Sequence, residues 1–144
     1  MAKENETKLH LRIITPEKTK VDEEVDMVIM RCSTGEIGIL PGHQPHAAVL
    51  NLGVLRIKNN GSERYIAVYG GLVTVRDNLV TVLTGEAEWP EEVDLLRAHH
   101  TREQAELRLR EKADDREILH DQALLRRALV QIEVSEGTLV GLDE

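Results

Sequence analysis

The stretch YIAVYGGLVTVRDNLVTVLTGEAEWP, residues 65–90, decides the fold of the larger part of the chain and marks where that part ends. Within it Val73 and Val75 flank Thr74, a period of two residues that is typical of a β-strand with one buried face. The strand-like runs are separated by the turn-forming pairs Gly70-Gly71 and Asp77-Asn78. The stretch therefore predicts short strands joined by tight turns.

The same alternation extends back towards the N-terminus. Leu9, Leu11 and Ile13 occupy one face of a predicted strand, and Asn60-Gly61 between two strand-like runs is a strong hairpin signal. Residues 1–87 hold 17 Val and Ile residues and 8 of the 10 Gly residues, a composition that favours strands and turns. At ~5–6 residues per strand there is room for about eight to ten short strands, which predicts an all-β sandwich or barrel.

The chain changes character at Glu88-Trp89-Pro90. Residues 88–144 hold 10 Leu residues and 23 charged residues, and Leu, Glu and Arg favour helices. Because proline suits the first position of a helix, we expect a first helix over residues 90–112. Asp114-Asp115 then interrupts the pattern and can cap a second helix over about residues 116–134. Two helices joined by so few residues predict an antiparallel hairpin.

Both predicted helices have narrow apolar stripes. The first stripe consists of Leu95, Ala98, Ala105 and Leu109, and the second of Ile118, Gln122, Leu125, Leu129 and Ile132. Such a pair buries little area, so the hairpin should be marginally stable alone and able to move. We therefore predict two domains, residues 1–88 and 89–144, with a frayed tail over residues 136–144.

Composition excludes several classes of protein. The net charge of −8 argues against nucleic acid or an anionic lipid surface as the main partner. Cys32 is the only cysteine, so no internal disulfide can form, and a reducing compartment fits. The polar N-terminus lacks an apolar signal region, and no apolar stretch approaches the ~20 residues needed to span a bilayer. We expect a soluble chain, or one held at a membrane through another protein.

No catalytic motif is found in the sequence. No Gly is followed by Lys, so there is no P-loop, and there is neither a Gly-x-Ser-x-Gly elbow nor a His-Glu-x-x-His helix. His43 and His46 could form a metal pair, but no carboxylate or cysteine completes it nearby, and a structured turn is the better interpretation. We therefore predict no catalytic residues and no metal site, and an enzyme acting alone is disfavoured.

Three motifs resemble those of the epsilon subunit of F-type ATP synthase. Residues 35–43, GEIGILPGH, resemble the first signature of that family, and residues 70–75, GGLVTV, resemble the second. Residues 93–98, VDLLRA, resemble the Ile/Leu-Asp-x-x-Arg-Ala motif that opens the C-terminal helices of the family. The resemblance covers roughly residues 9–134. It implies a ten-stranded β-sandwich followed by a two-helix hairpin, in agreement with the pattern of the residues themselves.

The resemblance implies a place in the rotor of a bacterial-type, proton-translocating ATP synthase. In that family the sandwich binds the gamma subunit and rests on the c-ring. The hairpin lies folded, or extends along gamma into the alpha/beta catalytic head and inhibits ATP hydrolysis. The chain would then be a non-catalytic, peripheral subunit on the cytoplasmic side of the cell membrane. Its partners would be gamma, the c-ring and the head, without nucleic acid and without insertion into the membrane.

The resemblance also implies ATP as a regulatory ligand, with no cofactor required. The positions that match the ATP site of the family are Glu88, Val93, Asp94, Arg97, Ala98 and Arg127. Gln104 and Gln131 are departures, because the family has phosphate-facing arginines there, and two positive charges are therefore missing. Arg126 points about 100° away from Arg127 on a helix and does not replace them. These residues do not decide whether ATP binds, and they favour weak over tight affinity.

Two further sets of contacts follow from the resemblance. Glu36 and His43 match a loop that faces the c-ring and gamma, although turn geometry alone explains the glycines and proline of this loop. The inhibitory contact with the head is expected from Arg116, Arg126 and Arg127, which can meet an acidic surface. Two alternatives stand beside the rotor subunit: a stand-alone nucleotide sensor of the same fold, and an unrelated β-sandwich enzyme with a helical appendage.

Overall fold

The computed structural model describes residues 8–111 and 114–136. The chain divides into two compact units, Met1–Ala87 and Glu88–Glu144. The tail that was predicted to fray lies outside the described residues beyond Glu136.

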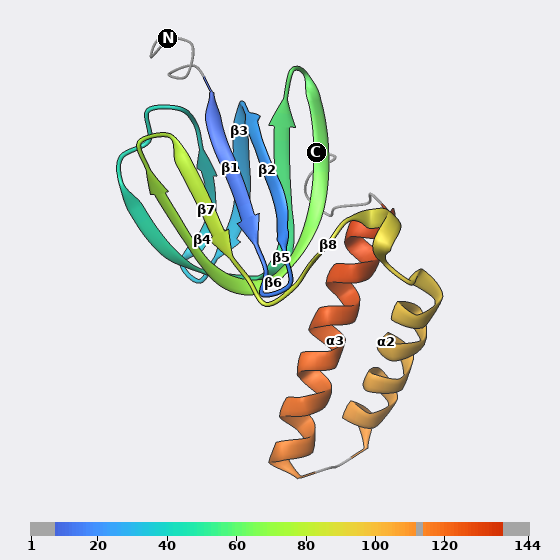
Figure 1. Ribbon diagram of the computed structural model, residues 1–144. Coiled ribbons are helices and arrows are strands. Elements are labelled where there is room, and N and C mark those ends of the chain that lie inside the picture. Colours follow the sequence, from blue (N-terminus) through green and yellow to red (C-terminus); the bar gives the residue numbers. More distant parts are fainter. Residues whose placement is uncertain (1–7, 112–113, 137–144) are drawn as a thin grey trace. The chain divides into compact units, whose positions relative to one another are not determined.

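The first unit is a strongly curled sheet (Figure 1). Its eight strands, counted over the residues that the structure describes, are β1 (Leu9–Ile14), β2 (Thr19–Val25), β3 (Met27–Cys32), β4 (Gly35–Ile39), β5 (His46–Asn59), β6 (Ser62–Arg76), β7 (Leu79–Leu83) and β8 (Ala87–Glu88). Neighbours follow the order β2-β1-β7-β6-β5-β3-β4, and β8 pairs with β6. β1 and β7 run parallel, and the other pairs along this order are antiparallel.

β5 and β6 are the longest strands, with 14 and 15 residues. Both bend, so that each runs from one side of the curled sheet to the other (Figure 1). Because each bent strand takes the place of more than one short strand, the strands are fewer and longer than the ten that the resemblance implied. The predicted fold class, a β-sandwich followed by a two-helix hairpin, is confirmed.

β6 contains two glycines with a backbone conformation that other residues rarely adopt. Gly70 and Gly71 have φ values of 84° and 132°. A Cβ atom on Gly71 would lie 2.0 Å from the backbone oxygen of Leu83 on β7. Only glycine therefore fits at position 71, because it combines a positive φ with close approach of a neighbouring strand.

The core of the first unit follows the predicted alternation. Val73 and Val75 are buried while Thr74 between them is exposed. Leu9, Leu11 and Ile13 are fully buried on one face of β1. The sequence contains no Phe, and the core consists mainly of aliphatic side chains.

A polar cluster ties the start of β1 to the turn between β5 and β6. The Lys8 Nζ donates to Asn59 Oδ1 at 2.6 Å and forms an ion pair with Asp26 Oδ1 at 2.8 Å. The Asn60 N–H donates to the other Asp26 carboxylate oxygen at 2.8 Å. The hydrogen bond from Lys8 lowers the pKa of Asp26 below its ordinary value, because it favours the charged form.

The second unit is a helical hairpin preceded by a single 3₁₀ turn. Its elements are η1 (Pro90–Glu92), α2 (Leu95–Arg110) and α3 (Asp115–Glu136). The prediction that the first helix begins at Pro90 is wrong. The Glu92 carboxylate accepts the Trp89 N–H at 2.8 Å and closes a separate turn, and Asp94 Oδ1 accepts the Arg97 N–H at 3.1 Å to cap α2.

The buried faces of the two helices agree only in part with the predicted stripes. Ala98 and Ala105 are buried on α2, as predicted. On α3 the buried face contains Asp121 and Ala128, whereas Leu129 is 45% exposed. The stripe prediction for α3 is therefore confirmed at Ile132, which is 7% exposed, and wrong at Gln122 and Leu129, because the buried face of the helix passes through Asp121 and Ala128 instead.

Candidate functional site

Glu36 lies in β4, and His43 lies in the turn that follows this strand. Glu36 is exposed and lies opposite Arg31 in the β3–β4 register. The His43 N–H donates to the Leu40 carbonyl at 3.2 Å, and His43 Nδ1 lies 2.7 Å from the Gln44 carbonyl oxygen. These bonds make residues 40–44 an ordered turn, as the turn interpretation predicted. Whether Glu36 and His43 contact a partner stays a prediction.

An asparagine on the neighbouring turn supports this loop. Gly42 has a φ of 87°, and its N–H donates to Asn78 Oδ1 at 2.7 Å. The loop after β4 is thereby fixed to the turn between β6 and β7. His43 and His46 have ring centroids 6.0 Å apart. In the described residues no group of three or more His, Cys, Asp or Glu side chains is placed to hold a metal ion.

An exposed apolar row crosses three neighbouring strands of the first unit. Val49 on β5 lies opposite Leu72 on β6, and Leu72 lies opposite Leu83 on β7. The three side chains, called the apolar row below, are 52%, 51% and 48% exposed, respectively. The next row on this face, Ala47, Thr74 and Thr81, carries no charge. The sequence prediction missed the apolar row, because alternation identifies a strand but not which apolar residues lie outside the core.

In the second unit, two of the residues that match the ATP motif, Asp94 and Glu88, form local hydrogen bonds. Asp94 caps α2, and its Oδ1 accepts the Arg97 N–H at 3.1 Å, a backbone contact that leaves the Arg97 side chain exposed. Glu88 Oε1 accepts a hydrogen bond from Gln131 Nε2 at 3.1 Å, which joins the segment before η1 to α3. The sequence marks Gln131 as the position of a missing arginine, and no sequence pattern indicates its bond to Glu88.

The remaining candidates for ATP contact differ in exposure. Ala98 is buried, Val93 and Arg127 are half-buried, and Arg97 is exposed. Arg127 lies one helical turn before Gln131 on α3, so these two side chains project on the same side of the helix. The structure thus brings Glu88 together with Gln131, and Asp94 together with the Arg97 backbone. The role of these residues towards ATP stays a prediction.

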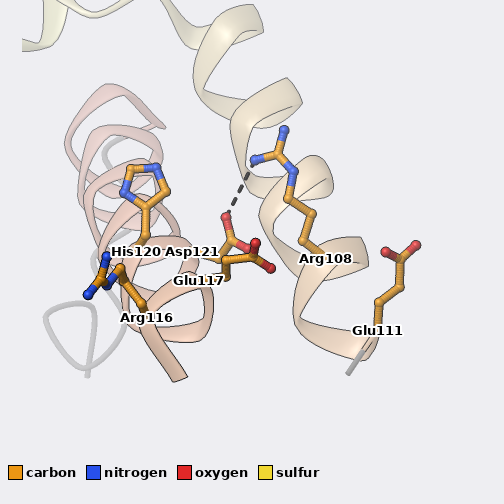
Figure 2. A pocket seen from close by; sticks show the side chains of 6 residues that line it. All are labelled: Arg108, Glu111, Arg116, Glu117, His120 and Asp121. Carbon is orange, nitrogen blue, oxygen red and sulfur yellow. Dashed lines mark hydrogen bonds and ion pairs between the residues drawn. The ribbon is translucent and has the colours of Figure 1, made fainter. Parts of the chain in front are cut away.

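The arginines expected to meet the catalytic head are spread along α3. Arg116 and Arg126 are exposed and are separated by about 15 Å of helix. Arg116 lines a cavity of about 700 Å³ at the tip of the hairpin, whose lining residues are Arg108, Glu111, Arg116, Glu117, His120 and Asp121 (Figure 2). None of the residues that match the ATP motif lines this cavity. Neither described helix combines the length and apolar character needed to cross a bilayer.

Comparison with known proteins decides the family. Residues 8–90 match the family model of the ATP synthase delta/epsilon chain β-sandwich domain. The ATP synthase epsilon chain of Caldicellulosiruptor bescii is 40% identical over 126 residues, which cover 88% of this chain and 92% of the relative. The chain belongs to the ATP synthase epsilon chain family. The epsilon chain of Bacillus licheniformis is 38% identical over 127 residues, with coverage of 88% and 97%.

Solved structures share the fold of this epsilon-family chain. A chain in the Euglena gracilis mitochondrial ATP synthase, solved with OSCP, F1 and the c-ring, superposes with a TM-score of 0.80 at 22% identity. The match covers 90% of this chain and 82% of that chain, and therefore includes both the strands and the helices. A chain in the central stalk and c-ring structure of the Tetrahymena thermophila mitochondrial enzyme matches over 60% of this chain with a TM-score of 0.52.

Proposed function

We propose that this chain is the epsilon subunit of a proton-translocating F-type ATP synthase and a non-catalytic part of its central stalk. The observation that carries the proposal is the 40% identity to a bacterial epsilon chain over 92% of that relative, which spans both units. In this role the chain joins the gamma subunit to the c-ring. It is then held peripherally at the cytoplasmic side of the cell membrane through the complex.

Association with both stalk partners tests this proposal. The full chain, coexpressed with gamma and the c-ring, should copurify with them in a fixed ratio. A stand-alone nucleotide sensor of the same fold would not be retained by either partner. Recovery of the chain as a folded protein without gamma or the c-ring would therefore favour the sensor over the rotor subunit.

The apolar row is the part of the sandwich best suited to gamma. It is flanked by uncharged side chains and lies outside the core, so a partner that covers it removes aliphatic surface from water without desolvating a charge. Glu36 on β4 and His43 in the following turn supply a polar contact for the c-ring. The hydrogen bond from the Gly42 N–H to Asn78 supports this assignment, because a turn fixed in advance has less entropy to lose on binding.

The hairpin is proposed as the inhibitory element. Its narrow buried faces support a structure that can leave its folded state at small cost. In the extended state Arg116, Arg126 and Arg127 would meet acidic surface on the alpha/beta head. An inhibitory role requires two hairpin states of similar free energy, which a ligand can bias only through its differential affinity.

ATP is proposed as a weak regulatory ligand of this hairpin. The Glu88 carboxylate is bonded to Gln131 and the Asp94 carboxylate caps α2, so a triphosphate would meet two engaged carboxylates and fewer cations than in the family. Gln131→Arg should tighten ATP binding by about 1.5–3 kcal/mol through a charge-assisted hydrogen bond. Arg97→Ala should weaken whatever binding exists.

Calorimetric titration with ATP and Mg²⁺ measures these changes. Gln122→Arg is a matched control, because it adds the same charge at an exposed position on the same helix. If the wild type binds tightly and Gln131→Arg leaves the affinity unchanged, the phosphate site has been placed wrongly.

A further inference from the structure

Asp121 is the one charged side chain that is buried within residues 8–111 and 114–136. Its side chain is 7% exposed. It lies on the face of α3 that also carries the buried Ala128, within the α2–α3 hairpin. A carboxylate in such a place loses most of its hydration, and this loss must be offset by close, well-directed partners.

The compensation of this buried charge is incomplete. Arg108 Nη1 on α2 approaches Asp121 Oδ1 at 3.4 Å, across the two helices (Figure 2). Charge-assisted hydrogen bonds are shorter, at about 2.7–2.9 Å. The Arg108 side chain is 53% exposed, so water screens its attraction for Asp121. Closing the hairpin therefore costs most of the hydration of the Asp121 carboxylate, and the long, solvent-screened contact with Arg108 offsets only part of this cost.

The other side chains around Arg108 and Asp121 do little to neutralise the buried charge of Asp121. From α2 the cavity is lined by Arg108 and Glu111, and from α3 by Arg116, Glu117 and His120. Two of these are carboxylates, which repel Asp121. Glu117 precedes Asp121 by one helical turn on α3, so the two carboxylates project on the same side of the helix. In Figure 2 Arg116 and His120 extend away from the Arg108–Asp121 contact. The surroundings thus favour an Asp121 that regains water.

We propose that the Arg108–Asp121 pair is a conformational device that holds the hairpin in register and at the same time biases it towards opening. Arg108 stabilises the closed hairpin because it partly neutralises the charge of Asp121. Separation of α2 from α3 returns the carboxylate to water and recovers its hydration, which lowers the free energy of the open state. The two members of the pair therefore act in opposite directions: Arg108 favours the closed hairpin and Asp121 favours the open one.

Substitutions of Arg108 and Asp121 should change hairpin opening in opposite directions, and this distinguishes the pair from an ordinary stabilising ion pair. Arg108→Met leaves the buried carboxylate without its partner and should raise hairpin opening about tenfold, a modest value because Arg108 is half-exposed. Asp121→Leu removes the buried charge and leaves Arg108 in water, so it should lower opening about tenfold. An ordinary ion pair would give more opening with both substitutions.

Amide hydrogen exchange of the full chain measures opening in α2 and α3, with the amides of β6 as an internal reference for the stability of the first unit. Arg110→Met and Gln122→Leu are matched controls at exposed positions of α2 and α3, and each should change exchange less than twofold. Asp121→Ala repeats the charge deletion without adding bulk, and should also slow exchange. Faster exchange of the α2 and α3 amides in both Asp121 variants, or unchanged exchange in Arg108→Met, would overturn the proposal. This outcome is independent of whether the chain binds gamma or the c-ring.

Discussion

Gly71→Ala is expected to destabilise the first unit by more than about 3 kcal/mol, which is more than a hundredfold in the folding equilibrium. Gly71 has a φ of 132°, a conformation that side chains with a Cβ rarely adopt. The added Cβ would also lie 2.0 Å from the Leu83 oxygen and 3.0 Å from the Thr84 Cα. Both neighbours belong to the backbone, so β6 and β7 must separate locally to admit the methyl group.

Urea unfolding of the full chain, followed through amide signals of β6 and β7, measures this loss. Gly85→Ala is the matched control, because a Cβ there meets nothing within 4 Å and the φ of Gly85 is outside the positive range. The control should change the free energy of unfolding by less than about 0.5 kcal/mol. Equal stabilities of the two variants would show that the bend at Gly71 is not constrained as described.

Leu72→Asp is expected to weaken association with the gamma subunit about a hundredfold while leaving the sandwich folded. Leu72 is the central member of the apolar row and is half-exposed, so the free chain tolerates a carboxylate at this position. A partner that covers the row would bury the new charge without a counter-ion, at a cost of about 3 kcal/mol.

Titration of the full chain against purified gamma gives this change in affinity. Leu96→Asp is the control, since it introduces the same charge at a leucine of the second unit that is 85% exposed. Unchanged affinity of the Leu72→Asp variant, in a chain whose unfolding curve matches the wild type, would place the gamma contact elsewhere on the sandwich.

Much of the fold could be predicted from the sequence because local patterns of apolar and polar residues indicate it. The alternation through Val73, Thr74 and Val75 identified a strand and its buried face, and both were found. The continuity of β6 through a bend could not be predicted, because a Gly-Gly pair is equally typical of a turn. Whether such a pair ends a strand depends on the close approach of β7, which is a tertiary contact.

The contacts of the second unit were less accessible to sequence reasoning. Pro90 and the acidic residues after it fit the start of a helix, but Asp94 competes for that start with a better capping geometry. The bond between Gln131 and Glu88 joins residues 43 positions apart, and no local pattern encodes it. The burial of Asp121 had no sequence signal either, because periodicity assigns buried positions to apolar residues.

We propose that this chain is a rotor-stalk subunit whose hairpin restrains ATP hydrolysis. The most direct test of this proposal is the ATP hydrolysis rate of an ATP synthase assembled with the full chain, compared with the same complex assembled with residues 1–88. Both forms must first be shown to be incorporated in equal amounts. We expect a several-fold higher rate with residues 1–88, because the hairpin can no longer enter the catalytic head. Equal rates at equal incorporation would contradict the proposal.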